Sequence, residues 1–97
     1  MITFEQARTI VAEAEKPTWD NGTYVTLDWG YENDQEFCVL AGCKEALIDH
    51  DPEFWQFDAP TRFVEKATGK LIYRDPYMSA NEVGTLLQSM LLVGNHG

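Results

Sequence analysis

Basic residues are scarce in this chain of 97 residues. Seven lysines and arginines face sixteen aspartates and glutamates, which gives a formal charge of −9 at pH 7. A surface of this sign repels the phosphates of nucleic acids and attracts basic macromolecules. The composition therefore excludes nucleic acid as the expected partner and favours a protein with a basic surface.

Residues on which enzymes and metal sites depend are also few. The chain has only two histidines, and Cys43 with His50 is the single conceivable pair of nucleophile and base. No motif indicates a third group that would orient them. The group formed by Asp49, His50, Asp51 and Glu53 matches no metal-binding motif. We therefore expect a protein that is not an enzyme and that holds no metal or other cofactor.

Glycine clusters, a disulfide framework and long apolar runs are missing as well. The seven glycines form no phosphate-binding loop, which leaves nucleotide binding without support. Cys38 and Cys43 are too few and too close to frame a secreted disulfide-bonded domain, and we expect them to be reduced. No apolar run approaches the roughly 20 residues that span a bilayer, and the N-terminus has no leader pattern. A cytoplasmic location without membrane attachment is the expectation.

Apolar residues make up 44% of the sequence, which is enough for one modest core, so residues 1–97 are expected to form a single domain. Residues 3–6 have the sequence of a capping box and predict a helix that ends before Pro17. The apolar positions of this helix recur at three- and four-residue steps. Its solvent face is expected to carry Glu5, Arg8, Glu13 and Glu15.

Four strands and a second helix are expected after the first helix. Residues 23–29 alternate, with Val25, Leu27 and Trp29 on the face expected to be buried, and residues 36–41 supply an antiparallel partner. Residues 42–58 predict irregular chain with short helical turns. Residues 61–66 and 71–74 predict a second hairpin. Its turn uses Gly69, because a positive φ is required there.

The last predicted element is a helix that starts at a second capping box, residues 79–82, and ends at Gly94. The expected fold class is α+β, with an antiparallel four-stranded sheet of two hairpins packed by N-terminal and C-terminal amphipathic helices. The element order is helix, two strands, an irregular stretch with short helix, two strands, helix.

The negative charge is concentrated in the middle of the chain. Residues 28–58 hold nine of the sixteen acids and a single base, Lys44. We interpret this stretch as one docking surface for a basic protein, in which carboxylates steer and aromatic rings anchor. The predicted partner-binding residues are Asp28, Tyr31, Glu32, Asp34, Glu36, Asp49, Asp51, Glu53 and Trp55. The alternative is that the acids serve only solubility.

A family resemblance is carried by three segments of the sequence. These are the opening residues 1–4 that lead into a helix, the strand pair within residues 29–40, and Pro60 followed by residues 63–71. In these segments the chain resembles the YrhB-like proteins of the immunity protein thirty-five family. It departs from that family at Ala59, where the family usually shows a glycine before the proline.

The resemblance implies a small bacterial protein that neutralises a toxin by binding it, and one branch of the family is described as a small chaperone. With the charge pattern, it predicts an immunity protein that occludes a basic toxin domain, such as a nuclease, without catalysis. The alternative is a chaperone-like holdase that binds unfolding clients through apolar surface within residues 86–93. The chain is expected to be a monomer or a homodimer.

Overall fold

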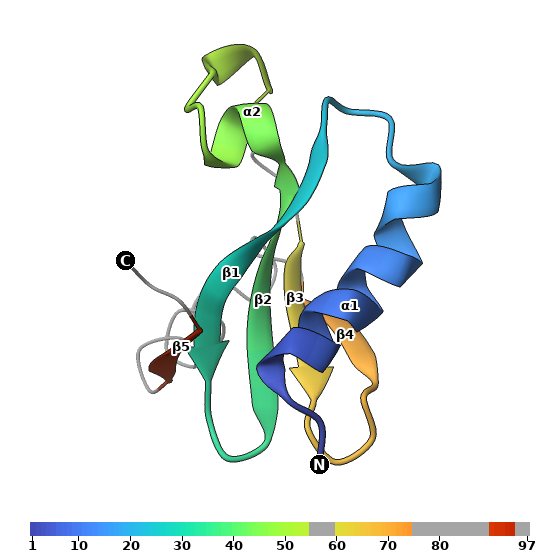
Figure 1. Cartoon of the computed structure of the whole chain (residues 1–97), viewed down its shortest axis with the longest axis vertical. Coiled ribbons are helices and arrows are strands. Elements are labelled where there is room, and N and C mark those ends of the chain that lie inside the picture. The colour runs from blue at the N-terminus through green and yellow to red at the C-terminus, as the bar shows by residue number, and fades with distance from the viewer. Residues whose placement is uncertain (55–59, 75–89, 95–97) are drawn as a thin grey trace.

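One helix lies across one face of a five-stranded antiparallel sheet in the computed structural model (Figure 1). The structure describes residues 1–54, 60–74 and 90–94. The strand order in the sheet is β4-β3-β2-β1-β5. The elements, in chain order, are α1 (Phe4–Glu15), η1 (Lys16–Thr18), β1 (Tyr24–Glu32), β2 (Glu36–Cys43), α2 (Lys44–Leu47), η2 (Pro52–Phe54), β3 (Thr61–Glu65), β4 (Leu71–Arg74) and β5 (Leu91–Gly94).

Helix α1 begins where the sequence predicts. The Gln6 amide donates to the Thr3 hydroxyl oxygen at 3.1 Å, and the Thr3 amide donates to the Gln6 side-chain oxygen at 2.8 Å. This reciprocal arrangement is the expected capping box. Pro17 has no backbone N–H to donate to the preceding turn, so the α-helix ends before it. The chain continues as the short 3-10 helix η1.

The apolar side chains form a core on each face of the sheet. On the face covered by α1, the helix contributes Phe4, Ala7 and Val11, and strands β2 and β3 contribute Phe37, Val39, Ala41 and Val64. On the opposite face the buried cluster is Cys38, Phe63 and Met90. Strands β2 and β3 therefore have apolar side chains on both faces, which is the pattern of central strands.

Two glycines allow α1 to sit close to β1 and β5. A Cβ atom at Gly30 would collide with the Cys38 carbonyl oxygen and would lie 3.2 Å from the Phe4 ring. A Cβ atom at Gly94 would collide with the Asp28 carbonyl oxygen and would lie 2.9 Å from the same ring. The Phe4 ring can occupy this place only because both neighbours lack a side chain.

The second predicted hairpin is confirmed. Strands β3 and β4 pair antiparallel, with Phe63 opposite Ile72, and the turn between them contains Gly69 at a φ of 76°. Glycine adopts a positive φ at little cost in free energy because it has no side chain, so the role predicted for Gly69 in this turn is confirmed.

The C-terminal part of the predicted fold is corrected. Residues 91–94 were expected to end a helix, but they form strand β5, which pairs antiparallel with the outer side of β1 and makes a fifth strand. The rest of that predicted helix lies outside the described residues, except for Met90, which is not helical. A short apolar run such as Leu91, Leu92 and Val93 fits a strand as well as a helix. Pairing with the edge of β1 makes it a strand here.

The predicted face of β1 is also corrected. The register between β1 and β2 shifts between Thr26 and Gly30, so simple alternation does not hold along the strand. Tyr24, which was expected to be solvated, packs against the core on the α1 side. Val25 and Leu27 are only half-buried.

A buried ion pair joins α1 to the sheet. The Arg62 guanidinium of β3 donates from Nε to both carboxylate oxygens of Glu15, at 2.8 and 2.6 Å, and the two side chains are 8% and 10% exposed. Arg62 Nη1 also donates to the carbonyl oxygens of Ala41 and Pro60. Glu15 was expected on the solvent face of the helix, and the structure overturns that expectation.

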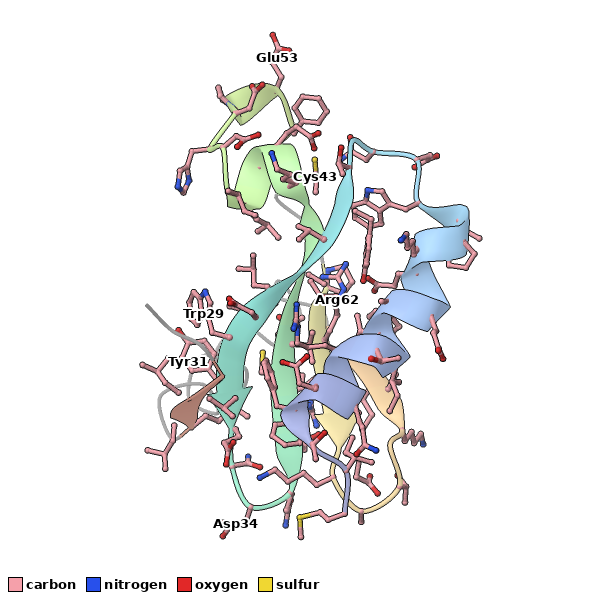
Figure 2. The ribbon with its side chains drawn as sticks, viewed as in Figure 1. Trp29, Tyr31, Asp34, Cys43, Glu53 and Arg62 are labelled. Carbon is pink, nitrogen blue, oxygen red and sulfur yellow. The ribbon has the colours of Figure 1, made fainter. Side chains whose placement is uncertain are left out.

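Two tyrosine hydroxyls complete this arrangement, which we call the Glu15 cluster (Glu15, Tyr24, Arg62 and Tyr73). They donate to the Glu15 carboxylate at 2.9 Å from Tyr24 and 2.8 Å from Tyr73. Burial and the hydrogen bond to Glu15 raise the pKa of Tyr73 to about 12 and raise the pKa of Tyr24 in the same direction. Arg62 lies between the sheet and α1 in Figure 2, and the cluster ties the helix to β1, β3 and β4.

None of the helices in the described part of the chain has the length and apolar character that crossing a membrane requires.

Replacing Glu15 by glutamine should destabilise the fold strongly, because the Arg62 charge would stay buried without its carboxylate. Breaking a buried pair in this way lowers the free energy of unfolding by about 3–5 kcal/mol. Urea denaturation followed by circular dichroism measures the change. Glu13→Gln, on the exposed side of the same helix, is the matched control, with an expected change within about 0.5 kcal/mol. Equal stability of the two variants would contradict the role given to the Glu15 cluster.

Candidate protein-docking surface

A loop with two short helical turns projects beyond one end of the sheet, where α2 and η2 follow strand β2 (Figure 1). We call residues 44–54 the tip. The Lys44 amide donates to the Thr23 carbonyl oxygen at 2.7 Å, which ties the tip to the start of β1. Within the tip, the Asp51 amide donates to the Glu45 carbonyl oxygen at 2.8 Å. These hydrogen bonds give the projecting backbone a defined path.

The Glu45 side chain strengthens this attachment. Its carboxylate accepts hydrogen bonds from the Cys43 thiol at 2.9 Å, the Thr23 amide at 2.9 Å and the Thr23 hydroxyl at 2.8 Å. These donors favour the ionised form, with the Cys43 thiol contributing most, and they lower the pKa of Glu45 to about 2. Glu45 therefore serves the fold, and its charge already has partners within the chain.

Gly22 lets the turn before β1 approach the tip. Its φ is 72°, and a Cβ atom there would lie 2.5 Å from the Cys43 sulfur and 2.5 Å from a Glu45 carboxylate oxygen. The same atom would lie 3.1 Å from the Phe54 ring. The tip and the turn thus touch so closely that no side chain fits between them.

The outward side of the tip combines apolar and acidic groups. Leu47 is 37% exposed and Ile48 is 47% exposed, and they are followed directly by Asp49. Asp49 and Glu53 are exposed, and Glu53 lies at the extreme end of the molecule in Figure 2. Lys44 forms a half-exposed ion pair with Asp49 at 3.2 Å, which is worth little in water. An apolar pair beside carboxylates has the composition of an interface centre with a polar rim.

The backbone of the tip is strained at one residue. His50 has a φ of 57°, a backbone angle that residues other than glycine adopt uncommonly. The Asp51 carboxylate then accepts a hydrogen bond from the Glu53 amide at 3.0 Å, so it caps η2. A strained residue persists only where its surroundings determine its conformation, so the tip is preorganised.

The acids predicted to form one docking surface lie in separate places. Asp34 is in the turn between β1 and β2, and Figure 2 shows it at the opposite end of the molecule from Glu53. The long axis of the molecule measures 36 Å. The structure brings Asp49, Asp51 and Glu53 together in the tip and does not bring Asp34 near them.

Two other predicted residues are engaged inside the fold. Glu36 is 8% exposed, and its carboxylate pairs with the Arg74 guanidinium at 3.0 Å. Glu32 is partly buried and pairs with the Lys66 amine at 3.4 Å. Because both carboxylates have basic partners within the chain, they add little to the charge that an approaching protein would meet.

The remaining predicted residues lie apart from the tip. Asp28 is exposed in the middle of β1. The Tyr31 ring packs against the buried cluster on the sheet face opposite α1, and it meets the Trp29 ring edge-on with centroids 5.9 Å apart. Tyr31 is therefore a partly buried packing residue, and Trp55 lies outside the described residues.

The thiols and the histidine do not form a catalytic pair. Both cysteines are free and buried. The Cys43 thiol donates to Glu45, a carboxylate, while the His50 side chain is exposed. Burial, with the nearby Glu36 charge, raises the pKa of Cys38 to about 12, which disfavours the thiolate. In residues 1–54, 60–74 and 90–94 no group of three or more metal-binding side chains occurs.

A surface cavity of about 480 Å³ lies at the Asp34 end and was not expected from the sequence. Glu36, Lys66 and Arg74 contribute to its wall. These three side chains form ion pairs within the chain, while Asp34 and Glu65 add two carboxylates to the wall, and Arg74 Nη1 is buried without a hydrogen-bond partner among the described residues.

Sequence reasoning missed the two exposed apolar residues of the tip. The sequence predicted short helical turns within residues 42–58 but did not indicate which apolar side chains these turns would leave exposed. Helix α2 has only four residues, so Leu47 and Ile48 remain at the surface. The only signal in the sequence is Pro52, which limits how far that helix can extend.

Comparison of the chain with family models, with curated proteins and with solved structures found no match. The resemblance to the immunity protein thirty-five family stays a prediction from the sequence.

The hydrogen bonds of the Glu45 carboxylate should make the stability of the fold depend on pH. Because the folded pKa of about 2 lies below the ordinary value of 4.5, the unfolded chain binds the proton more readily. The stabilisation is present above pH 4.5 and is lost as the pH falls towards 2. The melting temperature of the natural chain should fall more steeply across this interval than that of Glu45→Gln. The control Glu13→Gln should show the same dependence of melting temperature on pH as the natural chain. If Glu45→Gln also shows that dependence, the Glu45 carboxylate does not stabilise the tip as described.

Proposed function

We propose that the chain is a cytoplasmic, non-catalytic binding protein of the immunity type. It neutralises a basic toxin domain, such as a nuclease, by covering the cationic surface that the toxin needs. The observation that carries this proposal is the tip, where the exposed Leu47 and Ile48 lie beside Asp49 and Glu53 on a preorganised backbone. Of the nine residues that the sequence predicts for partner binding, the proposal rests on Asp49, Asp51 and Glu53, and Trp55 lies outside the described residues.

The two kinds of side chain have different tasks in binding. Exposed carboxylates attract a basic partner over a distance and raise the association rate. Apolar side chains that lose water in the complex slow its dissociation. Leu47 and Ile48 are exposed and could be covered by a partner, and Asp49 and Glu53 are exposed in the same segment.

A preorganised tip also lowers the entropic cost of binding. Loop ordering at an interface costs about 0.5–1.5 kcal/mol for each immobilised flexible side chain. The hydrogen bonds of Glu45 with Thr23 and Cys43 exist before any partner arrives. More of the contact energy therefore remains available for affinity.

Occlusion without chemistry is consistent with the buried ionisable groups. Glu15, Glu36 and Arg62 lie in ion pairs within the described part of the chain. They hold elements of the fold together, and Glu36, which lines the cavity at the Asp34 end, does so as the partner of Arg74. The cytoplasmic assignment is supported by the two buried thiols, which carry no disulfide.

The holdase function is the alternative. The exposed side chains of Leu91 and Leu92 favour it, because unfolding clients bind to exposed apolar surface. Suppression of aggregation of reduced insulin, lost in Leu92→Lys and unaffected by changes at Asp49 and Glu53, would support the holdase over the immunity function.

Charge reversal at the tip should slow binding of the partner. The partner to test is the protein encoded beside this chain's gene, expressed alone and immobilised for biolayer interferometry. The double variant Asp49→Lys, Glu53→Lys should lower the association rate constant about tenfold at 50 mM NaCl and much less at 500 mM, because salt screens exposed charges. The variant Leu47→Ser, Ile48→Ser should instead raise the dissociation rate constant.

The matched control is Glu13→Lys, Asp34→Lys, which makes the same change in net charge at exposed positions away from the tip. It should bind nearly as the natural chain does. Equal losses in the two charge variants would show that net charge alone acts. Unchanged rates in both tip variants would refute the assignment of the tip.

A further inference from the structure

The tip, residues 44–54, is attached to the rest of the protein mainly by hydrogen bonds. None of its side chains belongs to the buried cluster on either face of the sheet or to the partly buried residues packed against these clusters. Neither α2 nor η2 contains a buried residue. A segment with few buried apolar contacts opens at a lower free energy than the core of the same protein. The tip therefore has the properties of a unit that opens while the sheet stays folded.

The hydrogen bonds that leave the tip converge on one residue. The Lys44 amide donates to the Thr23 carbonyl oxygen, and the Thr23 amide and hydroxyl both donate to the Glu45 carboxylate. A further hydrogen bond to Glu45 comes from Cys43, the residue that directly precedes the tip. Across residues 1–54, 60–74 and 90–94, no other hydrogen bond or ion pair joins the tip to the rest of the protein.

The interactions inside the tip are too weak to hold it closed without Thr23. Helix α2 has four residues, and an isolated helix of one turn is not stable in water. The ion pair between Lys44 and Asp49 is half-exposed and contributes little. The positive φ of His50 adds strain, which an open tip would release. Loss of the Thr23 contact should therefore also free the amides that are bonded within the tip.

We propose that the tip opens and closes as one unit on a folded sheet, and that Thr23 is the positioning residue that keeps it closed. Thr23 lies outside the tip and is not among the predicted partner-binding residues. Its amide and hydroxyl bind a carboxylate, and hydrogen bonds to a charged group are stronger than those between neutral groups. Removing the hydroxyl shifts the equilibrium towards the open form without changing any side chain of the tip.

The same equilibrium would regulate the affinity of the tip for a partner, which is a consequence that rests on the proposed function. Only the closed form holds the exposed apolar and acidic side chains of the tip in one fixed arrangement. When the form that binds is only partly populated, the apparent affinity is reduced in proportion to its population. The contact between Thr23 and Glu45 therefore sets how much of the protein is ready to bind.

Amide hydrogen exchange of the full chain, followed by NMR, tests the opening without any partner. In the natural chain the amides of Lys44, Asp49 and Asp51, which are hydrogen-bonded, should be protected less than those of the central strands β2 and β3. They should share one opening free energy, because they are released together. Thr23→Val should raise their exchange rates about tenfold, since it removes one hydrogen bond to a charged group. The amides of β2 and β3 should keep their natural rates.

Thr26→Val is the matched control. It makes the same substitution in β1, at a hydroxyl that has no hydrogen bond within the described part of the chain. It should leave the exchange of the tip unchanged. Thr23→Ser keeps a hydroxyl at the original position and should retain the natural exchange rates, which separates the loss of the hydrogen bond from a general disturbance of the turn.

Three exchange results would overturn the proposal. Tip amides that exchange only together with β2 and β3 would show that contacts beyond Thr23 hold the tip. Tip amides without protection in the natural chain would show that the tip has no closed form. Equal acceleration in Thr23→Val and Thr26→Val would show that Thr23 has no special part.

Binding of the partner tests the regulatory consequence separately. Glu45→Ala removes all the hydrogen bonds of the carboxylate, so the tip should be mostly open and the affinity should fall by roughly tenfold or more. Asp49 and Glu53 are unchanged in this variant, so an unaltered affinity would refute the regulation. If the protein encoded beside this chain's gene does not bind at all, the proposed function fails, while the opening measured by hydrogen exchange stands.

Discussion

The buried ion pair between Glu15 and Arg62 is the interaction on which the rest of the structure depends. It fixes the C-terminal end of α1 over the sheet and, through the hydroxyls of Tyr24 and Tyr73, joins strands β1 and β4 to the same carboxylate. Tyr24 follows Thr23, whose backbone and side chain hold the tip through Lys44 and Glu45. Thr23, which holds the tip, is therefore the direct chain neighbour of Tyr24, which belongs to the Glu15 cluster. Two charges in a dry environment are stable only because every partner is in place.

Fewer acids contribute to the negative surface of the molecule than the composition indicates. Among the acids of residues 28–58, Glu32, Glu36 and Glu45 are bound by groups of the same chain, and Asp49 forms a half-exposed ion pair with Lys44. The exposed acids among the described residues of this stretch lie in three places: Asp49 and Glu53 in the tip, Asp34 in the β1–β2 turn at the opposite end of the molecule, and Asp28 in the middle of β1. A negative total charge can therefore coexist with one small acidic and apolar tip.

Local sequence predicted those elements that local chemistry controls. The capping box at Thr3 and Gln6 and the positive φ of Gly69 are confirmed, since each depends on residues a few positions apart. The α+β class is confirmed for the same reason, because helix and strand periodicities are local. The end of the predicted last helix is wrong, since the apolar residues 91–93 can serve either a helix or a strand. The free edge of β1 favoured the strand, and Gly94 fits there only because it lacks a side chain.

The sequence by itself determined the composition of the candidate site: a stretch rich in carboxylates, with Lys44 as its only base and apolar residues between them. Tertiary structure decided which of those residues meet water. Glu36 and Glu15 became interior ions because Arg74 and Arg62, each more than 35 positions away in the chain, were brought beside them. Leu47 and Ile48 stayed at the surface because α2 ends after one turn. The reason is physical: the free energy of a charge or an apolar group depends on its neighbours in space, which residue order does not specify.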